Sequence, residues 1–195
     1  MGDRTNGAFD VVAIAASAGG LAALSVLLEE MPIDFPAAIV IVQHLDPRHR
    51  SLMADILTRR TKLPVKQAEQ GELLKPSTVY IAPPNNHLLV NGDGSLSLTQ
   101  TELVHFVRPS ADLLLESVAA SYKERAIAVV LTGTGTDGSM GVRAIKKMGG
   151  TVIAQDQGAE FFGMPSAAIA TGDVDFVLPL NEIPSALRSL VGAVQ

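Results

Sequence analysis

Short, largely apolar segments alternate with segments of helical period along most of this sequence. The apolar segments cover residues 9–16, 37–43, 64–67, 78–82, 126–131, 151–155 and 176–178. The segments between them repeat apolar residues every three or four positions, at 21–31, 51–60, 111–122 and 140–148, with further helices expected after Pro165 and from Asn181. This alternation is typical of βα units built around a parallel sheet. We therefore predict an α/β fold, with a single doubly wound, mostly parallel sheet flanked by helices.

Residues 87–91 and 95–99 follow a different pattern. Both segments alternate apolar and polar side chains, and the turn-forming residues 91–94 (Asn-Gly-Asp-Gly) lie between them. Two alternating segments joined by such a turn are typical of an antiparallel hairpin. We expect this hairpin at one edge of the sheet.

Composition limits the function classes. A chain of 195 residues that is 47% hydrophobic can form one continuous core, and we expect a leader at 1–9 followed by one domain at 10–195. The net charge of -5 argues against nucleic acid as a partner. The absence of cysteine excludes disulfides, Cys-based zinc sites and thiol nucleophiles, so any nucleophile must carry oxygen. The longest uncharged run, 11–28, is interrupted by Gly19-Gly20, which argues against a signal peptide or membrane insertion and favours a cytoplasmic protein.

Three predicted strands end close to a residue with catalytic potential. Ser17 follows the first strand, His44 follows the second, and Asp137 lies after the strand at 126–131 and a glycine-rich turn. Ligand sites in open parallel sheets gather at the carboxyl ends of the strands, so these side chains should lie on one rim. A serine hydroxyl needs an imidazole to accept its proton, and the imidazole needs a carboxylate to fix its tautomer. The sequence therefore predicts a serine hydrolase triad.

Each residue also has a simpler interpretation when taken alone. Ser17 can cap the helix that follows it, and Asp137 can form an Asx-turn. His44 can be a hydrogen-bonded core histidine, or part of a metal site with Asp46 and His49, although no further ligands stand at a suitable spacing. The occurrence of all three at strand ends favours the triad, and we expect no metal.

The glycine-rich turn offers a competing hypothesis. Gly133, Gly135 and Gly138 match the G-x-G-x-x-G fingerprint between a strand and a helix, and the next strand ends in Asp156, near the usual distance for a ribose-binding carboxylate. Against a dinucleotide site, Asp137 would place a negative charge beside the pyrophosphate. This alternative also leaves Ser17 and His44 without a role.

One stretch of the chain is locally basic. It contains Arg48, His49, Arg50, Arg59, Arg60 and Lys62. A solvated helix face is the preferred interpretation of this cluster, and a docking surface for an acidic partner is the alternative.

Four motifs, taken together, resemble the catalytic domain of chemotaxis protein-glutamate methylesterases, the CheB type. They are the segments 14–20 (IAASAGG), 42–45 (VQHL), 131–138 (LTGTGTDG), and the tail from 162–165 (FGMP) through 168–172 (AIATG) to 177–179 (VLP). The resemblance runs from about residue 10 to residue 190. Four motifs in the same order are far more specific than any one of them.

The resemblance implies that Ser17 is the nucleophile, His44 the general base and Asp137 the carboxylate. It also implies that backbone N–H groups near Gly19 and Thr134 hold the oxyanion. The family removes methyl groups from glutamate side chains on the cytoplasmic domains of methylated chemoreceptors, many members also deamidate glutamines, and no cofactor is used. A non-catalytic receptor-binding module that keeps only the fold is the remaining alternative.

The chain departs from the family pattern at three positions. Ala15 stands where members usually have Gly, Ala18 where they usually have Thr, and Thr134 where they often have Met. A change of side chain leaves the backbone N–H in place, so we expect Thr134 to keep its role as an oxyanion donor. The sequence leaves no room for the receiver domain that commonly precedes this domain, so we expect an isolated catalytic domain, a fragment of a larger protein, or a member of a subgroup with other control. The segment 43–47 (QHLDP) is similar to members fused to the receptor methyltransferase, so a receiver or methyltransferase domain in a parent protein is one of these alternatives.

Overall fold

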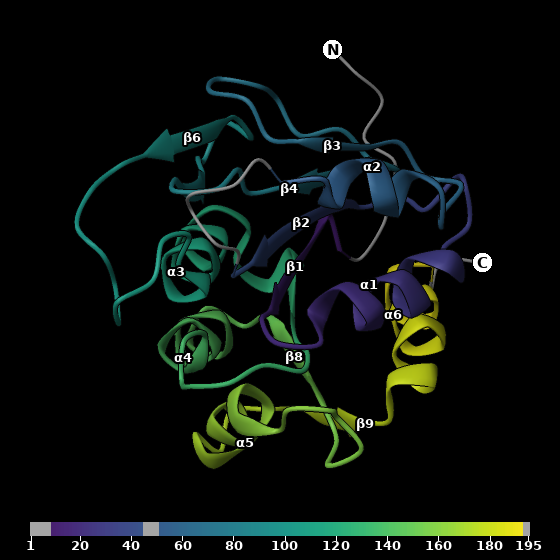
Figure 1. The fold of residues 1–195 in the computed structure, drawn as a ribbon, viewed down its shortest axis with the longest axis vertical. Coiled ribbons are helices and arrows are strands. Elements are labelled where there is room, and N and C mark those ends of the chain that lie inside the picture. Colours follow the sequence, from purple (N-terminus) through teal and green to yellow (C-terminus); the bar gives the residue numbers. More distant parts are fainter. Residues whose placement is uncertain (1–8, 45–50, 193–195) are drawn as a thin grey trace.

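The main sheet of the computed structural model has seven strands, and the structure describes residues 9–44 and 51–192. The strand order is β3-β4-β2-β1-β7-β8-β9, and every pairing within this sheet is parallel (Figure 1). The strands are β1 (Val11–Ala16), β2 (Ala38–Gln43), β3 (Val65–Gln67), β4 (Val79–Ile81), β7 (Ala126–Val130), β8 (Thr151–Gln155) and β9 (Phe176–Leu178). The α/β class and the parallel sheet predicted from the sequence are confirmed.

The order of the strands reverses beside β1. From β1 the chain forms β2, then the edge strand β3, and then β4 between them, and it later returns to form β7, β8 and β9 on the other side of β1. In open α/β sheets the crevice for ligands lies outside the carboxyl ends of the strands at such a switch point. The turns that follow β1, β2 and β7 therefore meet in the region where a site is expected.

Helices cover both faces of the sheet (Figure 1). One face carries α3 (Ala111–Tyr122), α4 (Ser139–Lys147) and α5 (Gly163–Ala170), and the other carries α1 (Gly20–Glu29), α2 (Met53–Thr58) and α6 (Ile183–Val191). Short 3₁₀ turns at Lys123–Arg125 and Leu180–Glu182 precede β7 and α6. The central strands are buried on both faces and consist almost entirely of Val, Ile and Ala, as parallel strands between two helical layers require.

The predicted hairpin forms, but it does not extend the main sheet. Strands β5 (His87–Val90) and β6 (Leu96–Thr99) pair with each other in a separate antiparallel sheet. The backbone of Val90 at the end of β5 is bound by side chains of α3: its N–H donates to Ser117 Oγ at 3.0 Å, and its carbonyl accepts from Ser121 Oγ at 2.8 Å. Because serines of α3 bind the backbone at the end of β5, the hairpin packs on this helix as a sheet of its own and adds no antiparallel strand to the main sheet.

The predicted helices form close to their expected bounds. The helix predicted at 111–122 is α3, and Ser110 caps it as expected, with its hydroxyl accepting from the N–H of Leu113. The helix predicted at 51–60 is shorter, at Met53–Thr58. Among the described residues, no helix combines the length and the apolar character that a bilayer crossing needs.

Candidate active site

Ser17 and His44 lie side by side because of the register of their strands. The last residues of β1 and β2, Ala16 and Gln43, are paired, so the next residue of each strand emerges at the same edge of the sheet. The backbone N–H of His44 donates to the carbonyl of Ala16 at 3.2 Å. Gln43 Nε2 donates to the carbonyl of Ser17 at 2.7 Å and thereby joins the two turns.

The side chain of Ser17 does not cap α1. The N-cap is Gly19, in the left-handed region at φ 75°, and the helix begins without a side-chain cap. The backbone of Ser17 is held by its own N–H donating to the Thr132 carbonyl at 3.0 Å and by its carbonyl accepting from Gly20 N at 2.8 Å. The capping interpretation is therefore wrong, and the hydroxyl has no role in starting the helix.

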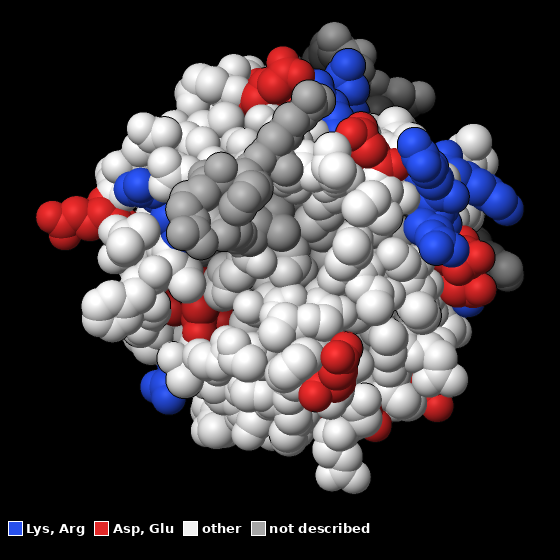
Figure 2. Space-filling model, in the orientation of Figure 1, with Lys and Arg blue, Asp and Glu red and all other residues white. Residues whose placement is uncertain are grey.

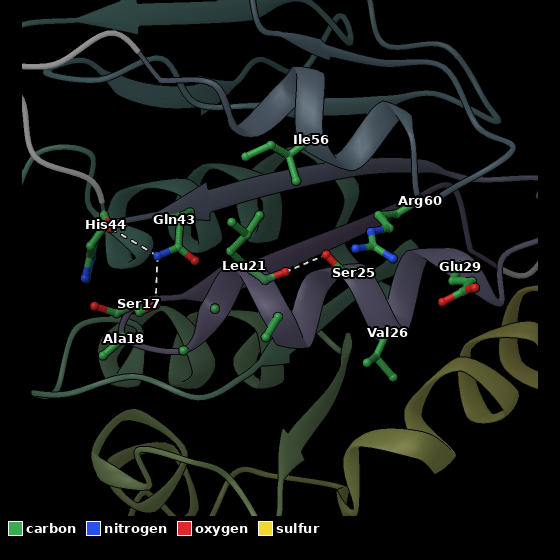
Figure 3. Close-up of a pocket in the computed structure, with 13 residues that line it drawn as sticks. Ser17, Ala18, Leu21, Ser25, Val26, Glu29, Gln43, His44, Ile56 and Arg60 are labelled. Carbon is green, nitrogen blue, oxygen red and sulfur yellow. Dashed lines mark hydrogen bonds between the residues drawn. The ribbon is translucent and has the colours of Figure 1, made fainter.

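Ser17 and His44 line one end of the same cavity, whose volume is about 800 Å³ (Figure 3). Within the described residues, no hydrogen bond joins the Ser17 hydroxyl to the imidazole. The two side chains are thus brought to one place without a direct bond between them. Catalytic contacts of this kind often tighten only when substrate is bound.

His44 and Asp137 are in direct contact. The distance from His44 Nε2 to Asp137 Oδ2 is 2.7 Å, and the two side chains are 15% and 4% exposed. The residues are 93 positions apart in the sequence, and the loop after β7 brings them together at the rim of the sheet. Because Nε2 is bound to the carboxylate, Nδ1 is the ring nitrogen that remains for a second partner.

The carboxylate of Asp137 is also held by the N-terminus of α3. Its oxygens accept from the backbone N–H groups of Ala111 at 2.7 Å and Asp112 at 3.0 Å, and from the hydroxyl of Ser110 at 2.9 Å. Burial by itself raises the pKa of Asp137, but the hydrogen bonds from His44 and from these backbone groups outweigh it and hold the pKa below its ordinary value. Asp137 is therefore an ionised acceptor and not the centre of an Asx-turn.

Asp112 completes a reciprocal arrangement that the sequence did not reveal. Asp112 Oδ1 accepts from the N–H groups of Gly138 at 2.9 Å and Gly141 at 2.8 Å, at the start of α4. Asp137, next to α4, thus caps α3, while Asp112, in α3, caps α4. Asp112 is 3% exposed, and burial raises its pKa, an effect that the nearby charge of Asp137 reinforces. The signal in the sequence was only an Asp in the first turn of a helix, which is too common to be informative.

The glycine-rich turn has structural roles that differ from those of a dinucleotide fingerprint. A Cβ at Gly133 would lie 2.9 Å from the Ser17 Cβ and 2.3 Å from the Met164 sulfur, so this glycine allows close packing behind Ser17. The N–H groups of α4 that would hold a pyrophosphate are bound to Asp112. Asp156 Oδ1 accepts from the N–H of Gly158 at 2.9 Å and so forms a local turn. The dinucleotide hypothesis is therefore not supported.

The predicted oxyanion donors come from two turns near Ser17: Gly19 lines the cavity with Ser17, and Thr134 follows Gly133, which packs against the Ser17 side chain. Within the described residues, the N–H groups of Gly19 and Thr134 donate no hydrogen bond. Gln43 is a contributor that sequence reasoning missed. Its amide binds the carbonyls of Ser17 and His44 at 2.7 and 3.0 Å, and a Cβ at Gly20 would lie 1.9 Å from its Oε1. Its only sequence signal was a polar residue at the end of an apolar strand.

The metal alternative finds no support in the described part of the chain. Across residues 9–44 and 51–192, no group of three or more His, Asp or Glu side chains is placed to hold an ion. Asp46 and His49, named in that hypothesis, lie outside the described residues, as do Arg48 and Arg50 of the basic cluster.

Comparison with known families agrees with this geometry. A family model described as CheB methylesterase matches residues 12–187. The chain belongs to the CheB methylesterase family. A relative from Thermotoga maritima, named protein-glutamate methylesterase/protein-glutamine glutaminase, is 42% identical over 93% of this chain and 54% of its own length. A group 3 operon relative of the same name from Rhizobium meliloti is 43% identical over 92% of this chain and 51% of its own length.

These CheB relatives differ in length. The chain spans about half of the Thermotoga and Rhizobium proteins, but it covers 91% of a putative protein-glutamate methylesterase/protein-glutamine glutaminase from Leptospira interrogans, which is 40% identical. The crystal structure of the Thermotoga maritima CheB methylesterase catalytic domain superposes with a TM-score of 0.90, at 41% identity, over 94% of this chain and 99% of that one. The resemblance to the CheB catalytic domain is confirmed.

Proposed function

We propose that this CheB family chain hydrolyses the methyl esters of glutamate side chains on the cytoplasmic domains of methylated chemoreceptors. Ser17 acts as the nucleophile, His44 as the general base and Asp137 as the carboxylate that orients the imidazole and stabilises its charged form. The observation that carries the proposal is the buried Asp137 carboxylate 2.7 Å from His44 Nε2, with Ser17 lining the same end of the cavity.

In the proposed first step, Ser17 Oγ attacks the ester carbonyl carbon while His44 Nδ1 removes the hydroxyl proton. The backbone N–H groups of Gly19 and Thr134 bind the oxyanion, an interaction worth about 2.7–4 kcal/mol per donor in a serine protease. The imidazolium then protonates the departing methoxide, which leaves as methanol and yields the acyl-enzyme. Water repeats the sequence with His44 as base, releasing the glutamate carboxylate and restoring Ser17.

The same chemistry extends to glutamine side chains. An amide carbonyl accepts the same attack, and ammonia leaves in place of methanol, so we propose a glutaminase activity as well. The names of the Thermotoga and Rhizobium relatives, which list both activities, support this extension. The division into a leader at 1–9 and a domain at 10–195, and a receiver or methyltransferase domain in the parent protein, remain predictions.

Methanol release from a peptide that carries a glutamate γ-methyl ester tests the proposal. Wild-type protein should release methanol, and Ser17→Ala should release none above the uncatalysed rate. Ser189→Ala is the matched control, because Ser189 is an exposed serine on α6 with no hydrogen bond among the described contacts. Retained activity in Ser17→Ala would exclude the covalent step, and peptide binding without methanol release from the wild-type protein would favour the non-catalytic module.

A further inference from the structure

The peptide between Ala18 and Gly19, in the turn that carries Ser17, is held by a side chain from another strand end. The Thr132 hydroxyl donates to the Ala18 carbonyl at 3.0 Å. Within the described residues, this carbonyl accepts no other hydrogen bond. Thr132 is 2% exposed and lies just after β7, so its hydroxyl connects the turn after β1 to the turn after β7.

The single proton of this hydroxyl has one suitable acceptor. Phe161 lies against the same oxygen: its N–H donates to Thr132 Oγ1 at 2.9 Å, and its carbonyl is 3.3 Å away. That carbonyl already accepts from the N–H of Gly133 at 2.9 Å, whereas the Ala18 carbonyl is closer and depends on the hydroxyl. The proton therefore goes to Ala18, and the N–H of Phe161 keeps the hydroxyl in this orientation.

The backbone of Thr132 is fixed on both sides. Its N–H donates to Oε1 of Gln155, a residue 3% exposed, at 2.9 Å, and its carbonyl accepts from the N–H of Ser17 at 3.0 Å. The side chain and the backbone of Thr132 thus bind consecutive parts of one turn. Groups held by several buried hydrogen bonds keep one orientation, which a catalytic site requires.

A fixed Ala18 carbonyl also fixes the direction of the Gly19 N–H. The peptide between them is trans, and in a trans peptide the C=O and N–H groups point in opposite directions. The Gly19 N–H is therefore directed away from Thr132. The side of Gly19 toward Thr132 is closed, because a Cβ there would lie 3.2 Å from Thr132 Oγ1 and 2.8 Å from Glu160 Oε2. Gly19 lines the cavity that contains Ser17, so a ligand meets this residue from the cavity.

Cationic side chains are scarce near Ser17. Figure 2 shows Lys and Arg toward the edge of this face, with a group on the side where α2 ends, and mostly uncharged residues in its middle, where β1 leads into α1. Arg60 is the only Lys or Arg among the described residues that line the cavity, and it lies toward the end opposite Ser17 (Figure 3). Backbone N–H groups are thus the described donors beside Ser17 that an oxyanion can use, and their direction decides how well they bind it.

We infer that Thr132 is a positioning residue of this esterase, whose hydroxyl holds the Ala18 carbonyl so that the Gly19 N–H points at the oxyanion formed when Ser17 attacks. This inference rests on the proposed function and adds a side chain outside the triad to it. Thr132 does not line the cavity, so it acts through the peptide and not on the substrate. A donor aimed at the oxyanion acts in the transition state, so loss of the hydroxyl lowers kcat and leaves KM nearly unchanged.

The test compares variants that lose this hydroxyl with one that keeps it. Thr132→Val and Thr132→Ala remove it, and Thr132→Ser retains it. Thr171→Val is the matched control, because the Thr171 hydroxyl likewise donates to a carbonyl, that of Ala168 at 2.6 Å, and accepts from a backbone N–H, that of Asp173 at 3.1 Å, at the end of α5 and outside the cavity. For each protein we measure urea unfolding, and kcat and KM for methanol release from a peptide with a glutamate γ-methyl ester. We also measure the affinity for a peptide boronate, which forms a tetrahedral adduct with a nucleophilic serine.

Thr132→Val should lose about tenfold to a hundredfold in kcat, less than the loss of about 10²–10³ that follows complete removal of a donor in a serine protease. It should bind the boronate more weakly by a similar factor, with KM within about twofold of the wild type. Thr132→Ser should recover kcat to within about threefold of the wild type, because its hydroxyl can bind the same carbonyl. Thr171→Val should keep the wild-type kcat and boronate affinity. A role of Thr132 in stability alone would lower the free energy of unfolding without this selective loss.

A second measurement uses the wild-type protein. When the boronate is added, the amide proton resonance of Gly19 in the NMR spectrum should move downfield, as expected for a donor that gains an anionic acceptor. A Gly19 resonance that does not move in the adduct would overturn the inference, and so would wild-type kcat in a folded Thr132→Val or Thr132→Ala. Both results leave the esterase proposal intact. Absence of methanol release by the wild-type protein would instead overturn the proposed function, and this inference with it.

Discussion

Replacing Asp137 should impair both folding and catalysis, because its carboxylate serves two structures. It accepts hydrogen bonds from His44, from the Ser110 hydroxyl and from two backbone N–H groups of α3. In Asp137→Ala, buried donors lose their acceptor, at about 1–3 kcal/mol for each group left unsatisfied. Local relaxation recovers part of this loss, so we expect the free energy of unfolding to fall by about 3–5 kcal/mol, a large share of the usual 5–15 kcal/mol.

Asp137→Asn separates the two effects. The amide oxygen can still accept from Ser110 and Asp112, but the amide NH₂ would face the N–H of Ala111 and His44 Nε2, where an acceptor is needed. We expect a smaller loss of stability, about 1–3 kcal/mol. We expect turnover to fall on the order of 10⁴-fold, as the equivalent change does in a serine protease triad.

Urea unfolding and methanol release at neutral pH measure the two quantities. Asp156→Asn is the matched control, since Asn supports the same local turn and should change stability by less than about 0.5 kcal/mol. If Asp137→Asn unfolds like the wild type and retains more than about a tenth of its turnover, the account of this carboxylate is wrong.

Three further predictions concern the surroundings of the triad. Because folding raises the pKa of Asp112, protonation of this carboxyl contributes to the free energy of unfolding in full below pH 3.8, its ordinary pKa, and this contribution is lost as the pH rises through the folded pKa. Asp112→Asn, whose amide oxygen can keep both backbone donors, should therefore lose less stability than the wild type between about pH 4 and pH 7 in urea unfolding. The pKa of Asp137 is lowered instead, so its contribution to the free energy of unfolding should be complete above pH 3.8 and be lost only as the pH falls through the folded pKa. The same urea series, with Asp137→Asn for comparison, measures this loss. Gly133→Ala should destabilise the protein by about 1–3 kcal/mol and lower methanol release by displacing Ser17, whereas Gly92→Ala, with no atom within 4 Å of the added Cβ, should leave both near wild type.

The positions of Ser17 and His44 were predictable because they depend on strand ends. A run of buried residues fixes where a parallel strand stops, and the topology of the sheet brings neighbouring carboxyl ends to one rim. Asp137 was predictable for the same reason, although it stands several residues beyond its strand. The pairing of His44 Nε2 with this carboxylate was not, since the choice of ring nitrogen depends on the angle at which the side chain leaves the strand.

The hairpin forms a sheet of its own for a physical reason. Alternating apolar and polar residues predict a strand with one buried face, but they do not identify the element that covers this face. Here Ser117 and Ser121, on one side of α3, bind the backbone of Val90 and hold the hairpin against that helix. Serines in a helix have no distinctive pattern, so nothing in the sequence distinguished this arrangement from an extension of the sheet.

The reciprocal capping of α3 by Asp137 and of α4 by Asp112 explains why the Asp137 carboxylate can remain ionised although it is 4% exposed. Burial alone would favour the neutral acid, which could not stabilise an imidazolium. The N–H groups at the start of α3 supply partial positive charge where Asp137 needs it, and Asp112 occupies the equivalent groups of α4, so Asp137 is not drawn to its own helix. The bonds from the N–H groups of Ala111 and Asp112 fix the Asp137 carboxylate against His44, and together with the two bonds to Asp112 they connect α3 to the start of α4. Both stability and catalysis should therefore fall in variants at Asp137, to different extents in Ala and Asn, whereas at Ser17, whose hydroxyl makes no hydrogen bond to the described residues, activity should be lost without stability.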